Sequence, residues 1–249
     1  MFTNTFQIDP KQTVVKDFLT SNIKAAHVFE KHGIDFCCKG NRPLKEACDE
    51  KNVSVETILT ELKNLDNSEV STDENRYEDW SLKFLSEYIV NNHHAYVKNA
   101  IPQILPHLEK VSFKHGNKYP QLKEVQSLFK SVAEELTSHM HKEETILFHI
   151  VRYLEDCKRF EEQPKMQGFK TVKNPIESME AEHTNAGNAM EKIRTLTDNF
   201  TPPEDACNTF KLTYKELEDF EKDLHIHVHL ENNILFPKAI KLESELLLI

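Results

Sequence analysis

Hydrophobic residues recur at helical spacing along most of this chain. Apolar positions three and four residues apart continue through four long stretches, at 80–111, 120–157, 174–199 and 203–245. Such spacing places apolar side chains on one face of an α-helix. Four helices of this length with short connections predict an all-α fold, an up-and-down four-helix bundle. We expect Pro102 and Pro106 to bend the first of them.

Shorter helical patterns precede the bundle. They begin near residues 14, 21, 43 and 54, with Ser21 and Ser54 as expected N-caps, Pro43 as a first helical residue and Gly33 as a stop. The stretch 66–79 is polar and mostly acidic, which predicts a linker. We therefore expect a small helical N-terminal domain at 1–65, an acidic linker at 66–79 and the bundle at 80–249.

Composition and charge narrow the class of protein. The chain has 249 residues, 39% of them hydrophobic and only 5 glycines, which favours helices over sheets. A net charge of −10 without a basic patch predicts no nucleic-acid partner. We expect no membrane span, because no apolar run approaches roughly 20 residues. We expect no signal peptide, because Met1 to Pro10 has no positive n-region with an apolar h-region. An odd cysteine count of 5 then fits a reduced, cytoplasmic compartment.

One motif of histidine, glutamate and apolar residues occurs twice. The first copy is His139-x-His141-x-Glu143-x-x-Ile146-Leu147-Phe148, and the second, 88 residues later, is His227-x-His229-x-Glu231-x-x-Ile234-Leu235-Phe236. Another histidine pair, His94 and His183, is 89 residues apart. A helix bundle builds a metal centre with two equivalent halves from His and Glu repeated in this way. The repeat therefore predicts a dinuclear iron site.

Helical geometry selects which members of the motif face inward. Residues four apart lie about 40° apart around a helix, so each Glu shares a face with the His four residues before it. His141 and His229 lie about 200° from their glutamates and are excluded unless the helix is distorted. On the first helix the apolar stripe passes between His93 and His94, and periodicity alone does not choose between them.

The third helix supplies one more inward histidine, because His183 lies within an apolar stripe. The proposed inner set is His94, His139, Glu143, His183, His227 and Glu231. Four imidazoles and two carboxylates exceed what one tetrahedral zinc ion uses. They suit two iron ions bridged by the glutamates, although manganese would use much the same ligands.

A pair of adjacent cysteines, Cys37 and Cys38, follows the second helix near an expected turn. We expect the cation of Lys39 to stabilise their thiolates, which makes both candidate catalytic thiols. The alternative is one buried thiol and one incidental thiol.

The motifs together resemble the "repair of iron centres" family of iron–sulfur cluster repair di-iron proteins. The matching segments are Asp35-Phe36-Cys37-Cys38-Lys39-Gly40, His93-His94-Ala95-Tyr96 with Ile101-Pro102, Ser138 to Phe148, Met179-Glu180-Ala181-Glu182-His183, and His229 to Pro237. The resemblance implies a hemerythrin-like bundle behind a domain with a vicinal cysteine pair. It assigns His94 as a ligand with the other five of the inner set, and leaves Glu182 beside them. Lys39 departs from the family, which often has glycine there.

The resemblance also implies a function. It predicts a cytoplasmic homodimer that repairs iron–sulfur clusters damaged by nitrosative or oxidative stress, by supplying iron to damaged proteins or assembly factors. The expected cofactor is two non-haem iron ions, oxo-bridged and glutamate-bridged. A repair or iron-donor factor is expected rather than a turnover enzyme, with a di-iron nitric oxide or peroxide reductase as one alternative. The other is a hemerythrin-like protein that binds or senses dioxygen or nitric oxide, which would take a fifth histidine from His93, His141, His149 or His229.

Overall fold

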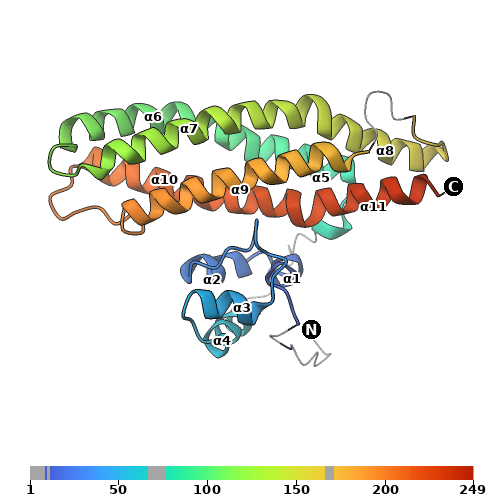
Figure 1. The fold of residues 1–249 in the computed structure, drawn as a ribbon, viewed down its shortest axis with the longest axis horizontal. Coiled ribbons are helices and arrows are strands. Elements are labelled where there is room, and N and C mark those ends of the chain that lie inside the picture. The colour runs from blue at the N-terminus through green and yellow to red at the C-terminus, as the bar shows by residue number, and fades with distance from the viewer. Residues whose placement is uncertain (1–8, 10–11, 67–76, 166–170, 249) are drawn as a thin grey trace.

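The structure, a computed structural model, describes residues 9, 12–66, 77–165 and 171–248. The fold is all-α: within these ranges every named element is a helix, and an isolated bridge joins Val14 to Pro43. A long four-helix bundle lies beside a small group of helices from the N-terminal part of the chain (Figure 1). Most of the predicted linker, at 67–76, lies outside the described residues, as does part of the connection before the third long helix.

Four short helices form the N-terminal unit. They are α1 (Val15–Ser21), α2 (Ala25–Lys31), α3 (Leu44–Glu50) and α4 (Val55–Asp66). The prediction that Ser21 caps the second helix is wrong, because Ser21 ends α1 and its hydroxyl donates to the carbonyl of Asp17. Asn22 instead accepts from the Lys24 amide just before α2. Gly33 follows α2 with φ +65°, the left-handed conformation that ends a helix.

The bundle consists of four rods, three of them interrupted by a π-helical turn. The rods are α5 (Leu82–Ile89), η2 (Val90–His94) and α6 (Ala95–His115); α7 (Gln121–Lys142), η3 (Glu143–Leu147) and α8 (Phe148–Phe160); α9 (Lys173–Leu196); and α10 (Asn208–Leu230), η4 (Glu231–Leu235) and α11 (Phe236–Leu246). A 3₁₀ turn, η1 (Tyr77–Asp79), precedes the first rod. Helix α6 continues through Pro102 and Pro106, and the irregular turn lies earlier, at η2.

Two apolar cores fill the bundle, and a polar layer separates them. The first core joins the N-terminal unit to the parts of the rods around Leu108, Phe129 and Phe220. The second core lies at the other end, around Phe148 and Phe236. Along every rod, the boundary between the two cores falls at buried histidine or glutamate side chains. None of the helices in the described ranges combines the length and apolarity needed to cross a lipid bilayer.

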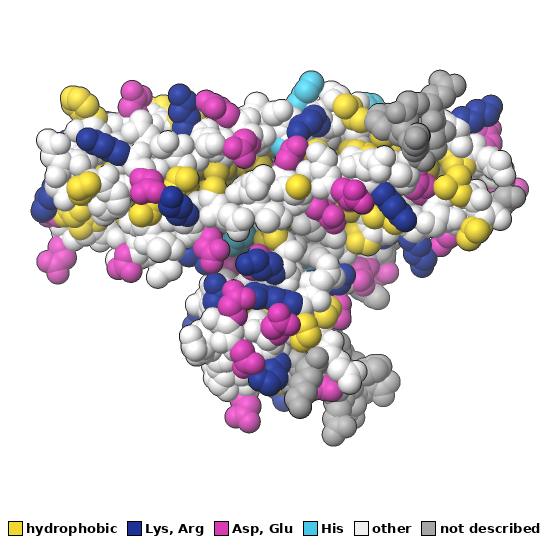
Figure 2. Space-filling model, viewed as in Figure 1, with side chains coloured by type: hydrophobic (Ala, Val, Ile, Leu, Met, Phe, Trp, Pro, Cys, Tyr) yellow, Lys and Arg dark blue, Asp and Glu magenta, His cyan; other side chains and the backbone are white. Residues whose placement is uncertain are grey.

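The N-terminal unit is attached to one long side of the bundle (Figure 2). The buried ring of Phe36 packs edge-on against the His225 ring, with centroids 5.6 Å apart, and against the His229 ring at 6.1 Å. The amide of Asn233 donates to the backbone carbonyls of Phe36 and Cys37, both at 3.3 Å. These contacts fix the turn with the two cysteines against α10 and η4.

Candidate metal centre

The six residues of the predicted inner set meet in the polar layer, and each is at most 1% exposed. Their side chains form two groups of four that share both glutamates. One group is His94, Glu143, His227 and Glu231, and the other is His139, Glu143, His183 and Glu231, with one ligand atom from each residue within 4.8 Å of the others. The geometry therefore provides two adjacent sites for cations, with two carboxylates common to both.

The imidazoles direct their Nε2 atoms into these groups. Around Glu143, the carboxylate lies 3.3 Å from His139 Nε2 and 3.4 Å from His94 Nε2. Around Glu231, the carboxylate lies 3.1 Å from both His183 Nε2 and His227 Nε2.

The donor atoms at the centre lack ordinary hydrogen-bond partners. Both oxygens of Glu143, one oxygen of Glu231 and His94 Nε2 are buried without a hydrogen bond among the described residues. His139 Nε2 and His183 Nε2 are only 2.9 Å apart. Burying unpaired carboxylates is costly, and such atoms normally have a partner. Cations in the two groups would supply that partner, so the residues fit a dinuclear metal site.

Outer hydrogen bonds hold three of the four rings in place. His94 Nδ1 donates to Glu144 at 2.7 Å, His139 Nδ1 donates to Glu182 at 2.9 Å, and His183 Nδ1 lies 2.8 Å from the Asn232 carbonyl oxygen. Carboxylate partners fix the proton on Nδ1 and leave the Nε2 lone pair directed inward, as metal-ligating histidines require.

Two of these outer residues, Glu144 and Asn232, are absent from the sequence-based candidates. The signal that identifies them is the repeat itself, because each directly follows the glutamate of its motif copy. Glu182 lies beside the inner set, bound to His139, as the family resemblance implies.

The π-helical turns coincide with the inner residues. Turn η2 ends at His94, η3 begins at Glu143 and η4 begins at Glu231. A π turn adds a residue to a helical turn, changes the direction of the side chains that follow and is frequent at functional sites. The two copies of the repeat therefore have the same backbone distortion, which begins at Glu143 in one and at Glu231 in the other. The regular helical geometry assumed from the sequence does not predict these π turns.

In the metal-free protein, protons take the place of cations. Burial opposes a charge on His94, but the carboxylates of Glu143 at 3.4 Å and Glu231 at 3.9 Å prevail and raise its pKa to about 10. Burial also opposes a charge on His139, but the negative charge of Glu143 outweighs burial and raises the pKa of His139 to about 9. Burial works against ionisation of Glu231 too, yet the adjacent His227 and His183 hold its pKa well below the usual range.

The other histidines do not join the two groups within the described part of the chain. His141 and His149 are exposed, and His93 turns its Nδ1 to Asp223 at 2.9 Å. His229 is fully buried against Phe36 and accepts from the Asn233 amide at 3.0 Å. The exclusion of His141 and His229 by helical geometry agrees with these positions, even though π turns follow both residues.

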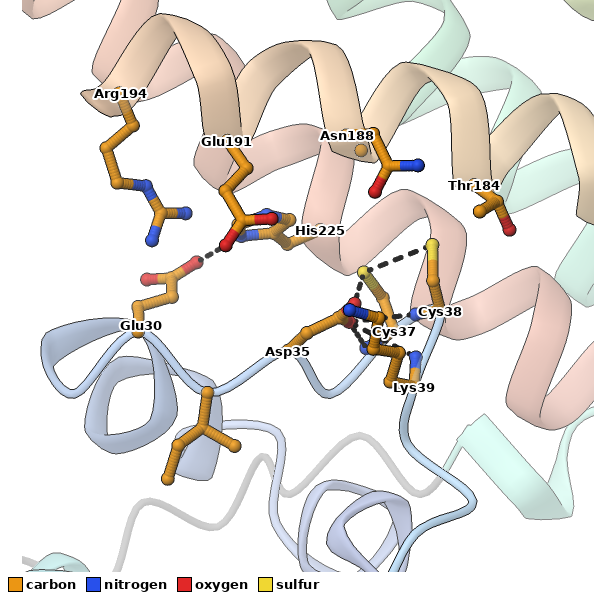
Figure 3. A pocket seen from close by; sticks show the side chains of 13 residues that line it. Glu30, Asp35, Cys37, Cys38, Lys39, Thr184, Asn188, Glu191, Arg194 and His225 are labelled. Carbon is orange, nitrogen blue, oxygen red and sulfur yellow. Dashed lines mark hydrogen bonds and ion pairs between the residues drawn. The ribbon is translucent and has the colours of Figure 1, made fainter. Parts of the chain in front are cut away.

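The cysteine turn borders a cavity of about 90 Å³ between the N-terminal unit and α9 and α10 (Figure 3). Asp35 organises the turn, since its Oδ1 accepts from the amides of Cys37 and Cys38, both at 3.0 Å. The two Sγ atoms are 3.9 Å apart, and Cys38 Sγ faces Gly187 of α9. Cys38 is half-buried, whereas Cys37 is 5% exposed.

The expected stabilisation of a thiolate by Lys39 is wrong for Cys37. A hydrogen bond with Cys38, together with burial and the charge of Asp35, raises the Cys37 pKa well above its ordinary value. Lys39 is exposed, and the nearest charged group in contact with Cys37 is the Asp35 carboxylate at 3.3 Å. The Cys37 thiol is therefore protonated at neutral pH.

Comparisons with known proteins cover both parts of the chain. Residues 11–66 match a domain of unknown function, DUF542, and residues 86–239 match the hemerythrin HHE cation-binding domain. The iron-sulfur cluster repair protein YtfE of Yersinia pseudotuberculosis serotype IB (strain PB1/+) is 34% identical over 221 residues, which cover 88% of this chain and 92% of that protein. The protein of the same name from Yersinia pestis (strain Pestoides F) matches with the same identity and coverage.

Proposed function

Because this chain belongs to the family of iron-sulfur cluster repair proteins with a hemerythrin HHE cation-binding domain, we propose that it restores damaged iron–sulfur clusters by supplying iron from a di-iron centre. The observation that carries the proposal is the pair of buried four-residue groups that share Glu143 and Glu231. Their chemistry suits two iron ions, each with two imidazoles and two bridging carboxylates.

The residues of the centre have distinct roles in this proposal. His94 and His227 would hold one iron and His139 and His183 the other, and the shared Glu143 and Glu231 would serve both. When bound, the iron supplies open coordination positions and the metal that a damaged cluster has lost. Glu144, Glu182 and Asn232 keep three of the imidazoles turned toward the metals.

Two observations favour repair over dioxygen carriage. Within the described residues no fifth histidine enters either group, because His93 and His229 are held by other partners and His141 and His149 are exposed. The N-terminal unit, which dioxygen carriage does not need, fixes two thiols against the bundle.

We assign Cys37 and Cys38 to the transfer of iron toward an acceptor. Both cysteines line the cavity. Cys38 is the more accessible thiol, and Cys37 is the buried thiol beside it. Asp35 adds a carboxylate oxygen to the same cluster, and in this proposal the three side chains form the acceptor site next to the bundle. Damaged iron–sulfur proteins or their assembly factors are the proposed clients of a cytoplasmic homodimer.

The first test is the iron content and electronic spectrum of anaerobically purified protein. We expect two irons per chain in the wild type and loss of both in Glu143→Ala, because Glu143 belongs to both groups. His141→Ala is the matched control, since His141 lies in the same motif but is exposed. Iron that persists in Glu143→Ala would refute the shared-carboxylate centre.

The second test is recovery of a damaged iron–sulfur enzyme. The double variant Cys37→Ala/Cys38→Ala is expected to keep its iron and lose repair. Full repair by this variant would remove the cysteines from the mechanism and leave the di-iron assignment intact.

A further inference from the structure

A continuous row of aromatic rings joins the metal centre to the surface. The His227 ring stacks on His93, with centroids 5.6 Å apart and planes 10° apart. His93 contacts Tyr88 at 5.9 Å, and Tyr88 contacts Trp80 at 5.0 Å, both edge to face. The row therefore starts on α10, crosses η2 and α5, and ends just before α5, with each ring in contact with the next.

This row differs from the aromatic surroundings of the other proposed ligands. His94 stacks on Phe148 and His183 stacks on Phe236, and phenylalanine resists oxidation. Tyrosine and tryptophan are the aromatic side chains that lose an electron most readily. Among the ring contacts of the described residues, only the one from His227 leads on to such side chains.

Two residues of the row, His93 and Trp80, are held by further contacts. His93 is 6% exposed, and its Nδ1 lies 2.9 Å from the Asp223 carboxylate. The backbone carbonyl of Trp80 accepts a hydrogen bond from the Lys238 ammonium of α11, and the Trp80 ring lies 4.7 Å from that of Tyr77. Fixed contacts matter because electron tunnelling falls steeply with distance.

The outer end of the row opens on a surface pocket. Trp80 lines a pocket of about 250 Å³ with the ammonium groups of Lys158, Lys238 and Lys241. The pocket also contains Glu155 and Glu245, so its net charge is positive. Glu155 accepts from the amides of Leu82 and Lys83 at the start of α5, at 2.9 Å each. Lys158 pairs with Glu245 at 3.4 Å, and Lys238 donates to the backbone carbonyls of Glu78 and Trp80. Among the described residues, this leaves Lys241 as the lysine of the pocket that can attract a small anion.

We propose that Tyr88 and Trp80 carry oxidising equivalents from the di-iron centre to this pocket, where a small anionic thiol removes them. The proposal rests on the di-iron assignment above. The aromatic row would then protect the centre. Oxidising equivalents from hydrogen peroxide would pass along the row to the surface before they oxidise the ligand side chains.

The electrons and protons balance as follows. Overall, one hydrogen peroxide takes up two electrons and two protons and becomes two waters. For each electron, half-buried Tyr88 gives an electron to the centre and its phenol proton to water, then regains the electron from Trp80 and a proton from water. Trp80 releases its indole proton, and a thiol returns a hydrogen atom to it. Two thiyl radicals then join as one disulfide.

The test uses the full chain, iron-loaded and iron-free, with one equivalent of hydrogen peroxide. Trp80 is the only tryptophan, so loss of tryptophan fluorescence and peptide mass mapping both report its oxidation. Tyr88→Phe keeps the ring and removes the readily oxidised group. Tyr96→Phe is the matched control, because Tyr96 is half-buried on α6 and packs on Phe220 away from the row.

We expect iron to accelerate Trp80 oxidation roughly tenfold, which corresponds to about 1.4 kcal/mol in the barrier. Tyr88→Phe should abolish that gain at unchanged iron content, because the row then has no readily oxidised side chain between His93 and Trp80. Tyr96→Phe should behave as wild type. Added glutathione should protect Trp80 and appear as its disulfide, less so in Lys241→Glu. Iron-loaded protein in which Trp80 oxidises no faster, or in which Tyr88→Phe changes nothing, would overturn the relay alone. A wild type that binds no iron would overturn the di-iron assignment and the relay with it.

Discussion

His229 is expected to contribute to the acid sensitivity of the iron-free protein, and His229→Gln to remove that contribution. Burial, with a contribution from the positive charge of Lys16, lowers the pKa of His229 to about 4. The hydrogen-bond pattern agrees with a neutral ring, since Nδ1 accepts from Asn233 and Nε2 has no partner among the described residues. Protonation would place a charge beneath Phe36, where the N-terminal unit meets the bundle.

The sign and size follow from linkage. An unfolded His has a pKa of about 6.5, so between pH 6.5 and 4 the unfolded chain binds a proton that the folded chain does not. Stability contributed by neutral His229 is complete above about pH 6.5 and is lost progressively as the pH falls to about 4. The full loss is about 3.4 kcal/mol, and at about pH 5.5 it is about 1.4 kcal/mol.

Urea unfolding of iron-free protein at about pH 8 and about pH 5.5 measures this loss. Wild type should lose about 1.4 kcal/mol more between the two pH values than His229→Gln does. His141→Gln, at an exposed histidine of the same repeat, should behave as wild type. Equal losses in wild type and His229→Gln would show that this ring is not held neutral by burial.

Three further substitutions test other parts of the structure. Phe36→Ala should destabilise the protein by about 3–5 kcal/mol in urea unfolding, because it empties a fully packed position between the N-terminal unit and α10. Glu144→Ala should weaken iron binding roughly 10–100-fold in chelator competition by releasing His94, whereas Lys98→Ala, at the exposed partner of Glu144, should have little effect. Gly33→Ala should lower the free energy of unfolding by about 1–2 kcal/mol, measured by thermal unfolding, because its φ is +65°. Gly187→Ala should instead raise it by up to about 1 kcal/mol, because alanine favours the helix and the new methyl would make only ordinary contact with Cys38.

Most of the residues that meet in the candidate site could be predicted, because metal ligation uses few residue types at fixed helical spacing. The pairs His139 and Glu143, and His227 and Glu231, lie four residues apart, and this spacing is enough to place them on one face. The choice of His94 over His93 needed the family resemblance, because the π turn η2 changes the direction of side chains there. Periodicity assumes a regular helix and fails where the helix is irregular.

The cysteine turn shows what sequence could not supply. Lys39 directly follows the two cysteines in the sequence, which predicts that its cation stabilises their thiolates. The fold buries Cys37 beside Asp35 and leaves Lys39 exposed, and these surroundings reverse the direction of the pKa shift. Similarly, the position of Ser21 suited a cap, but the chain begins α2 later, at Ala25.

The polar layer between the two apolar cores has a consequence for folding cooperativity. Apolar packing transmits stability along a bundle, and here it is interrupted on all four rods at the same level. With iron bound, coordination bonds link the rods across that interruption, so both ends should melt in one transition. Without iron, the layer holds buried carboxylates and imidazolium groups, and the end around Phe148 and Phe236 should open independently of the end that holds the N-terminal unit. Iron loading would then determine whether one end of the bundle can unfold by itself and be cut by proteases, and would thereby affect the lifetime of the protein.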